Sequence, residues 1–167
     1  MARVEDPTPE AVDPAAFKAA LRRWCSGVTV VTSSGTAGPH GMTVSAFSSV
    51  SASPPLVLVC CNRSSNSYGV MVESGIFGVN VLAAGQEALS GRFSDPDLDD
   101  RFAAIAWTPG ARTGAPLLDG AAMQLECRTR RTHDEGTHAI FIGEVVSAFS
   151  SDVAPLLYHD GAYARLG

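Results

Sequence analysis

Residues 43–61, TVSAFSSVSASPPLVLVCC, carry the most informative pattern for the fold. Its second half, residues 56–61, is a continuous apolar run, which is typical of a strand that is buried on both faces. The first half predicts another strand, which begins near Met42 and ends before the pair Pro54-Pro55. Side chains alternate along a strand, so one face of the first half carries mostly hydroxyl groups. That face comprises Thr43, Ser45, Phe47, Ser49 and Ser51.

The rest of the chain continues this pattern of short strands. β-Branched and apolar residues predict strands over residues 28–32, 76–82, 122–133 and 138–149, and a further short strand closes the chain. A turn is expected over residues 33–41, which are rich in Gly and Pro. Six or seven strands without a βαβ rhythm predict a mainly β fold, in which antiparallel strands close into a β-barrel with a few helices.

Three regions favour helices. Asp13 and Pro14 are a typical N-cap and first helical residue, and an apolar face follows them. Ser65 or Asn66 can cap a short second helix. Residues 84–106 favour two helical pieces that are separated by a proline.

One domain is expected from the length of 167 residues, because a chain of this size can bury a sizeable core. Residues 1–12 are polar and lack periodicity, so we expect a flexible N-terminal tail before a single domain over residues 13–167. Apolar residues make up 46% of the chain and charged residues 17%, as in globular proteins. The net charge of −5 argues against a nucleic-acid-binding protein, which would carry a basic face.

The composition also suggests a cellular location. The polar start has no apolar segment of the kind found in signal peptides, and no apolar run approaches the ~20 residues that span a bilayer. We therefore expect a cytoplasmic protein with no membrane association. The cysteines are interpreted as reduced, mostly buried thiols, and they are Cys25, Cys60, Cys61 and Cys127.

The common catalytic and metal-binding motifs are absent from the sequence. It contains no GxGxxG fingerprint, P-loop, HExxH or GxSxG. The four aspartates within residues 95–100 are interpreted as an exposed helix N-terminus. The histidines show no ligand spacing, so no metal site is expected, and they are His40, His133, His138 and His159.

A second polar cluster, NRSSNS at residues 62–67, follows the apolar run. If the two strands of the opening stretch pair, this cluster and the row of hydroxyl groups flank one site. Small donors along a strand suit the edge of a ring system, and a loop with hydroxyl, amide and guanidinium groups suits a phosphate. The same residue types are common on half-exposed strands and in turns, so spacing alone leaves an ordinary surface as the alternative.

Five segments together resemble the flavin reductase family, the short NAD(P)H:flavin oxidoreductases of two-component monooxygenases. The resemblance covers residues 14–167 and is most specific in GMT-x-SAFSSVS-x-x-PP. It implies an FMN-binding split barrel, usually a homodimer with flavin near the subunit interface, and it is closest to reductases of aromatic or natural-product metabolism. The segments are GVTVVT, HGMTVSAFSSVSASPPLVLVCCNRSSNS, IFGVNVL, THAIFIGEV and PLLYHDGAY.

The same resemblance implies roles for particular residues. His138 would contact the nicotinamide and is the candidate catalytic residue, although Gly136-Thr137-His138 stands where the family commonly carries Gly-Asp-His. Three groups of residues would bind the flavin. They are Thr43, Val44, Ser45 and Ala46 along the isoalloxazine edge, Ser48 and Ser49 near the ribityl phosphate, and Asn62, Arg63, Ser64, Ser65 and Ser67 on the phosphate side. Cys60, Phe93 and Tyr163 are assigned to the same cleft.

The implied reaction moves a hydride from nicotinamide C4 to flavin N5, and reduced flavin then passes to a partner monooxygenase. FAD or FMN would be the flavin and NADH the reductant, with NADPH possible because a 2′-phosphate could meet Arg92, Arg101 or Arg112. Because the flavin accepts the electrons, the protein mainly binds and orients, which fits the lack of an acid–base pair. The alternatives are a non-catalytic flavin-binding redox sensor or carrier, a pyridoxamine-phosphate-oxidase-like enzyme, and a barrel that binds an apolar ligand.

Overall fold

The computed structural model describes residues 11–166, so most of the predicted tail at residues 1–12 lies outside the described part. Three helices and twelve strands are present there. The helices are α1 (Pro14–Leu21), α2 (Asn66–Ser74) and α3 (Glu87–Ser94). The strands are β1 (Ser26–Gly27), β2 (Thr29–Gly35), β3 (Gly38–Val44), β4 (Phe47–Ala52), β5 (Pro55–Asn62), β6 (Ile76–Val81), β7 (Trp107–Pro109), β8 (Pro116–Leu118), β9 (Met123–Glu135), β10 (His138–Ser150), β11 (Leu157–His159) and β12 (Ala162–Ala164).

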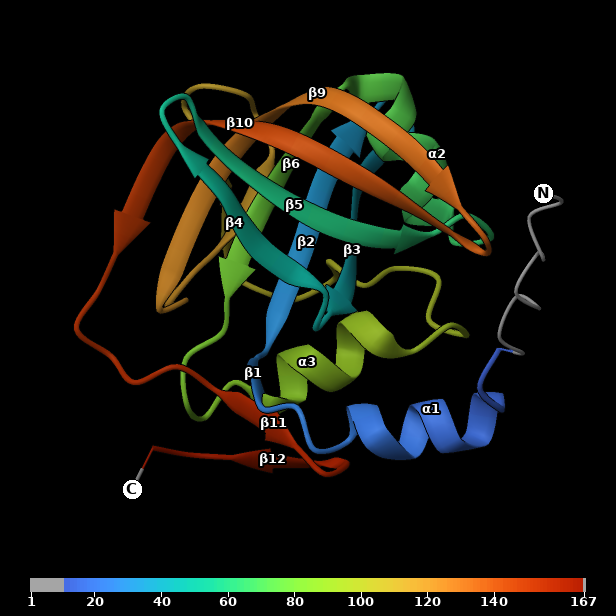
Figure 1. Cartoon of the computed structure of the whole chain (residues 1–167). Coiled ribbons are helices and arrows are strands. Elements are labelled where there is room, and N and C mark those ends of the chain that lie inside the picture. Colours follow the sequence, from blue (N-terminus) through green and yellow to red (C-terminus); the bar gives the residue numbers. More distant parts are fainter. Residues whose placement is uncertain (1–10, 167) are drawn as a thin grey trace, which may run out of the picture.

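The predicted mainly β fold is confirmed, and most of it is one curled sheet (Figure 1). Seven strands lie in the order β3-β2-β6-β9-β10-β5-β4, and every neighbouring pair is antiparallel. The two edge strands, β3 and β4, are consecutive in the chain and are joined only by Ser45 and Ala46. The curl therefore brings the edges together at one end without pairing them, and the predicted closed barrel is only approximate.

The single strand predicted from Met42 to the prolines is wrong. It is two strands that belong to opposite edges of the sheet, with β3 paired to β2 and β4 paired to β5. Ser45 and Ala46 form the break, and the alternation of side chains does not continue through it. The predicted turn over residues 33–41 is also too long, because β2 and β3 form a hairpin whose turn is only Thr36 and Ala37.

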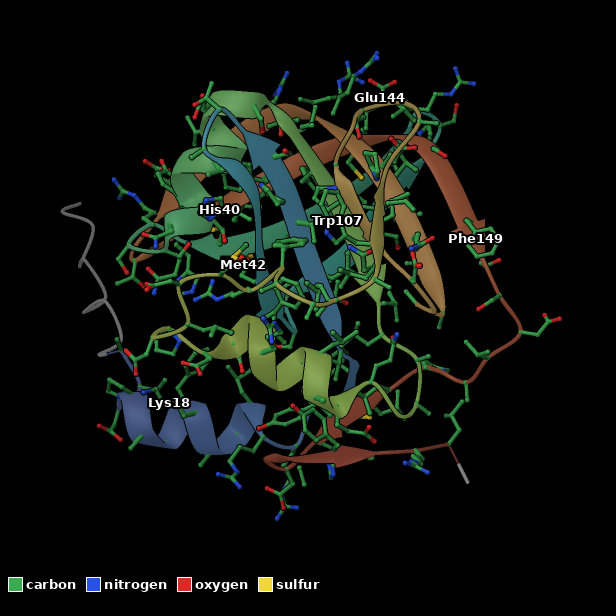
Figure 2. All side chains as sticks on the ribbon, turned by 180° about the vertical axis from the view of Figure 1, so that it is seen from behind. Lys18, His40, Met42, Trp107, Glu144 and Phe149 are labelled. Carbon is green, nitrogen blue, oxygen red and sulfur yellow. The ribbon has the colours of Figure 1, made fainter. Side chains whose placement is uncertain are left out.

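One side of the sheet encloses the main core. Val59, Phe77 and Phe141 lie in its interior and are fully buried. Met42 also points into this interior, where its Sδ lies 3.4 Å from the Sγ of Cys61 (Figure 2). Burial of these apolar side chains is the main favourable term in folding.

The apolar run in β5 is covered on one face only. Val57, Val59 and Cys61 are buried, whereas Leu56, Leu58 and Cys60 on the other face remain partly exposed. Ile140 and Ile142 of β10 lie opposite Cys60 and Leu58, and both are also partly exposed. The predicted burial on both faces is therefore not achieved within a single chain.

The first predicted helical piece within residues 84–106 is α3, but the second is wrong. Residues 95–106 form turns and a loop, so the aspartates there do not begin a helix. Two arginines hold this loop through backbone carbonyl groups. Arg92 donates to the carbonyl oxygens of Asp100 and Arg101, and Arg101 donates to those of Asp95 and Gly41. These contacts between distant residues favour the loop over the helix that the local sequence suggests.

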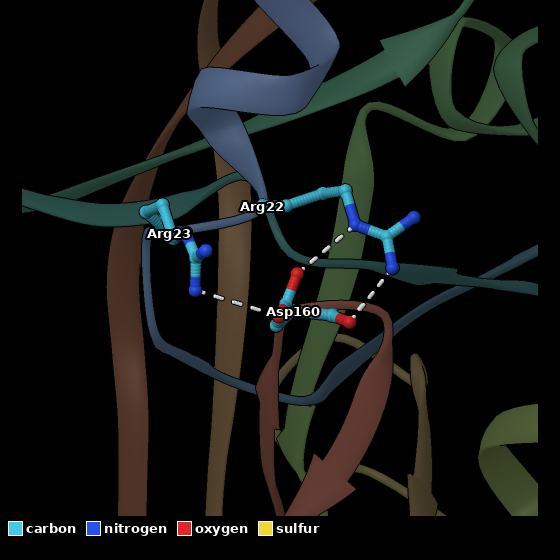
Figure 3. Close-up of polar contacts among 3 residues, drawn as sticks. All are labelled: Arg22, Arg23 and Asp160. Carbon is cyan, nitrogen blue, oxygen red and sulfur yellow. Dashed lines mark hydrogen bonds and ion pairs between the residues drawn. The ribbon is translucent and has the colours of Figure 1, made fainter.

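Helix α1 begins as predicted, because the Asp13 carboxylate accepts hydrogen bonds from the backbone N–H groups of the first turn. The helix has no buried residue, and its apolar side chains at Phe17 and Leu21 are exposed. Its C-terminal end is tied to the turn between β11 and β12, where Asp160 accepts from Arg22 and Arg23 (Figure 3).

The contact of Asp160 with the two arginines also changes the pKa of its carboxyl group. The hydrogen bond from Arg22, with the charge of Arg23 added to it, holds the pKa of the Asp160 carboxyl below its ordinary value. A carboxyl whose pKa is lowered by folding stabilises the fold above its ordinary pKa, and that contribution is lost as the pH falls through the lowered value.

No helix among residues 11–166 is long and apolar enough to cross a membrane.

Candidate functional site

The hydroxyl-rich residues meet where β3 runs alongside β5, and we call this place the seam. It comprises residues 42–46 of β3 and the following link, together with residues 60–62 of β5. The N–H of Cys60 donates to the carbonyl of Ala46 at 3.1 Å, and the Met42–Cys61 sulfur contact closes the inner side. β3 is an edge strand, so its outward backbone groups have no strand partner along the seam.

A cavity of about 260 Å³ lies beside the β3 end of the seam. Thr43, Val44, Ser45 and Tyr163 line it, as predicted for a common cleft. The sequence analysis did not identify its other lining residues, although Ser90 and Ser94 stand four apart on α3 and therefore share one face of that helix. These other residues are Gly27, Val28, Ser90, Ser94 and Tyr158.

Two tyrosines form one wall of this cavity. Tyr158 and Tyr163 are cross-strand partners on β11 and β12, and their rings pack edge to face with centroids 5.7 Å apart. Both side chains are substantially exposed, at 41% and 43%. An exposed aromatic pair beside a row of small polar groups offers an apolar face against which a flat ring can pack.

The hydroxyl groups in the seam and on the neighbouring strand β4 are not equally free to bind a ligand. Thr43 donates to the carbonyl of Ser90, and Ser48 donates to that of Ser49. Ser45 and Ser49 have no side-chain hydrogen-bond partner within residues 11–166. Ser45 lines the cavity itself. Ser45 is therefore the hydroxyl most available to a ring bound there.

Ser48 and Ser49 lie on β4 and point to opposite faces of the sheet, because their partners on β5 are Leu58 and Val57. Val57 faces the core and Leu58 faces outward, so only one of the two serines can turn its side chain toward a given ligand. The structure therefore does not bring Ser48 and Ser49 together as one phosphate-binding pair.

The cluster at residues 62–67 forms the turn that leads into α2. Asn62 accepts from the N–H and the hydroxyl of Ser64, and Ser65 caps α2 by accepting from the N–H of Tyr68, as predicted. Ser67 is 2% exposed, and its hydroxyl has no partner among the described residues. This burial is by the protein itself, so the Ser67 hydroxyl is closed to a ligand here and its contact with a phosphate stays a prediction.

His138 lies on the other side of this turn, where it begins β10. It stands directly opposite Asn62 across the strand pair, and the N–H of Arg63 donates to the carbonyl of Thr137 at 3.1 Å. An open depression of about 530 Å³ lies here. Its walls are Asn62, Arg63, Ser64, Tyr68, Gly136 and Thr137. The fold thus places the predicted nicotinamide residue beside the predicted phosphate loop.

Two other residues predicted to contact the flavin, Phe93 and Cys60, do not line the cavity beside β3. Phe93 is 1% exposed and packs edge to face on Phe102, and it also occupies the space beside Gly41 on β3. It therefore supports β3 from within the core, and its assigned flavin contact remains a prediction. Cys60 is partly exposed on the outer face of β5, beside the seam.

Three of the four thiols have raised pKa values. Burial raises the pKa of Cys60 and of Cys61, and it raises that of Cys127 to about 12. All three thiols are therefore protonated at neutral pH, and a protonated thiol is a poor nucleophile. Of the thiols expected to be mostly buried, Cys61 and Cys127 are buried, Cys60 is partly exposed and Cys25 is exposed.

The arginines considered for a 2′-phosphate are mostly engaged elsewhere. The guanidinium groups of Arg92 and Arg101 bind the carbonyls of the loop at residues 95–103. Arg63, which lies nearer to His138, pairs with Asp134 at 3.5 Å. The positions of Arg92 and Arg101 thus favour a structural role over recognition of NADPH.

Comparison with known proteins agrees with this geometry. The model of the flavin reductase like domain matches residues 21–167. An NADH flavin reductase of Kitasatospora aureofaciens is 42% identical, over 96% of this chain and 85% of that protein. The reductase subunit of a flavin-dependent monooxygenase of Rhodococcus jostii is 38% identical, over 94% of this chain and 80% of that protein.

A solved structure extends the similarity to three dimensions. The NADH:FAD oxidoreductase of Streptomyces globisporus C-1027, in complex with NAD and FAD fragments, superposes with a TM-score of 0.88 at 37% identity. The match covers 95% of this chain and 98% of that one. Sequence, seam and fold lead to one conclusion: the chain belongs to the family of proteins with a flavin reductase like domain.

Proposed function

We propose that this protein is an NADH-dependent flavin reductase that reduces FMN or FAD and releases the reduced flavin to a separate monooxygenase. The main support is the seam, where a ring-sized cavity lies beside the end of β3 and His138 stands opposite Asn62 at the end of β5. The names of the relatives support the same chemistry, since they include NADH reductases of flavin and a monooxygenase reductase subunit.

The residues in and around the seam have different binding roles in this proposal. Ser45 and the outward backbone groups of β3 bind the polar edge of the flavin ring, and Tyr158 and Tyr163 cover an apolar face. The turn at residues 62–65 and the first turn of α2 hold the phosphate, and His138 orients the nicotinamide from the hairpin. A bound flavin supplies the acceptor atom for the hydride, so the protein contributes mainly proximity and orientation.

The first experiment follows the loss of NADH absorbance in air by the purified protein without flavin, with FMN and with FAD. We expect oxidation that depends on added flavin, because no group of the protein itself accepts a hydride. Flavin binding without turnover would instead support a redox sensor or carrier. A protein that neither binds flavin nor oxidises NADH or NADPH would contradict the proposal.

We also infer that the protein is a homodimer. Leu58 and Ile142 lie side by side on the outer face of β5 and β10, and no helix of the described residues lies over this face (Figure 1). A strand that is apolar on both faces requires a layer on each side, and a second copy supplies the missing one. The family resemblance points to the same assembly.

Replacing Leu58 with arginine tests the dimer. The wild-type protein should show twice the mass of one chain by light scattering, and Leu58→Arg should shift it toward a single chain at micromolar concentration. Val72→Arg is the matched control, because Val72 is an apolar residue that is 54% exposed on α2, away from this face. An unchanged mass for Leu58→Arg, or a monomeric wild type, would contradict the inferred interface.

We further propose a single domain over residues 13–167 and a cytoplasmic location. The domain is supported by the pairing of β1 near the start with β11 near the end, which links both ends of the chain to one body. The location suits an enzyme that consumes NADH.

A further inference from the structure

We propose that Arg22 is a positioning residue, which keeps the tyrosine pair of the cavity beside β3 in place through a fork of hydrogen bonds to Asp160. Asp160 lies in the turn between β11 and β12, and these two strands carry Tyr158 and Tyr163. The inference rests on the proposed function only for the identity of the ligand in the cavity, a flavin. The fastening of the tyrosine pair is a property of the free protein.

Arg22 holds this turn at both its side chain and its backbone (Figure 3). Nε of Arg22 donates to the carboxylate of Asp160 at 3.1 Å, and Nη2 donates to the carbonyl oxygen of Asp160 at 2.8 Å. The N–H of Asp160 donates in return to the carbonyl of Arg22 at 2.9 Å. Arg23 adds a longer contact to the same carboxylate, at 3.5 Å. A planar guanidinium with fixed donor directions suits two neighbouring acceptors of this kind.

The turn fits closely against the guanidinium of Arg22. Asp160 and Gly161 have φ angles of 50° and 83°, the left-handed values that a two-residue hairpin turn requires and that Asp-Gly favours. A Cβ on Gly161 would lie 2.5 Å from Nη2 of Arg22. The backbone of the turn therefore lies directly against the guanidinium, with no room for a side chain between them.

The other attachments of the β11–β12 hairpin lie at its base. β12 is an edge strand, and β11 pairs with β1 only through Leu157 and Tyr158. Leu156, just before β11, is fixed by backbone hydrogen bonds to Val28 and Leu82. A hairpin that is attached only at its base could bend away at its tip, so the contact with Arg22 is what holds the tip.

The tyrosine side chains do not anchor the hairpin, because both are substantially exposed and pack on each other. Gly27 and Val28 follow Arg22 in the chain and line the same cavity, and Val28 is buried. The contact of Arg22 with the turn thus joins the tip of the hairpin to a segment that is itself part of the cavity lining. The tyrosine wall keeps its place beside β3 for this reason.

The consequence is that Arg22 determines how well a flat ring is held in the cavity. A ring that packs on the tyrosine pair loses contact when this wall moves. A second contact, from Arg165 to Glu87 on α3 at 3.3 Å, remains at the C-terminal end of the hairpin. Removing the guanidinium of Arg22 should therefore loosen the wall without detaching it, and it should weaken flavin binding rather than abolish it.

The test uses Arg22→Met in the full chain and follows amide hydrogen exchange together with FMN binding and NADH oxidation. Residues 157–164 should lose protection from exchange. The Kd and the KM for FMN should rise about fivefold, as expected for a weakened aromatic contact, and the loss should appear in these quantities rather than in kcat at saturating FMN.

Two further variants make the test specific. Asp160→Asn should stay within about twofold of wild type, because asparagine tolerates a positive φ and its amide oxygen accepts the same hydrogen bond from Arg22. Arg130→Met is the matched control, because Arg130 is also exposed and pairs with Glu144, at 3.8 Å on the β9–β10 hairpin. It should leave the exchange of residues 157–164 and the Kd for FMN unchanged.

The outcomes separate this proposal from the proposed function. Unchanged exchange in Arg22→Met, or faster exchange with an unchanged Kd for FMN, would overturn the role of Arg22 even in an active reductase. A loss in Asp160→Asn as large as that in Arg22→Met would overturn the fork of hydrogen bonds as its cause. The expected exchange in a protein that binds no flavin would leave Arg22 as the residue that holds the hairpin and overturn the reductase function instead.

Discussion

Replacing His138 with alanine should lower kcat/KM for NADH about tenfold while changing flavin affinity less than twofold. Loss of one hydrogen bond between protein and substrate corresponds to a free energy of about 1.4 kcal/mol, which is a tenfold effect. His138 lies at the hairpin, whereas the cavity assigned to the flavin ring lies beside Thr43 and Tyr163. The two effects should therefore separate in stopped-flow reduction and in flavin titration.

The matched control for this variant is His133→Ala. His133 is exposed on the same hairpin, but it stands opposite Ile140, two residues along β10 from His138. Its removal should leave both kinetics and flavin affinity unchanged. If His138→Ala loses flavin while hydride transfer per bound flavin survives, the role assigned to His138 is wrong.

Replacing Asn80 with leucine should lower the free energy of unfolding by about 3 kcal/mol. Asn80 is fully buried, and its amide nitrogen donates to Val30 and Thr32 while its amide oxygen accepts from Leu118. Leucine has a similar volume but would leave the buried N–H of Leu118 without an acceptor. Each buried unpaired group costs about 1–3 kcal/mol.

The effect of this substitution should appear in chemical denaturation, and Gln86→Met provides the control. Gln86 also bonds two backbone groups, at Ala83 and Asp119, but it is partly exposed, so water can replace both bonds. Its loss should cost less than about 1 kcal/mol. Equal losses for Asn80→Leu and Gln86→Met would show that burial of the Asn80 network does not matter.

The Asn80 network also explains a feature that the sequence does not reveal. Leu118 belongs to β8, which pairs with β7, and residues 108–120 read locally as a loop. Asn80 joins this small ribbon to the main sheet through a hydrogen bond that spans 38 residues. No local pattern specifies a contact at that separation.

The residue types of the candidate site could be predicted from the sequence, but its hydrogen bonds could not. The two polar clusters were expected to flank one site if the strands paired, and β4 does pair with β5. The neighbours of each hydroxyl group determine whether it is hydrogen-bonded. Thr43 donates to Ser90 of α3 and Ser64 donates to Asn62, whereas the hydroxyl groups of Ser45 and Ser67 have no hydrogen-bond partner among residues 11–166. Those neighbours are set by packing, so residue type alone could not distinguish the serines.

Features that depend on near neighbours in the chain could be predicted from the sequence alone. The caps at Asp13 and Ser65 and the apolar strands β5 and β6 all follow from residues within a few positions of one another. The motifs around residues 43–67 also sufficed to indicate the family.

Three other features depend on tertiary contacts: the break at Ser45 and Ala46, the loop at residues 95–106 and the contact of Thr137 with His138. The break exists because β3 and β4 find their partners at opposite edges of one curled sheet. The loop exists because Arg92 and Arg101 satisfy its carbonyl groups from a distance. Pairing and side-chain hydrogen bonding act between residues far apart in the chain, and there they outweigh local propensity.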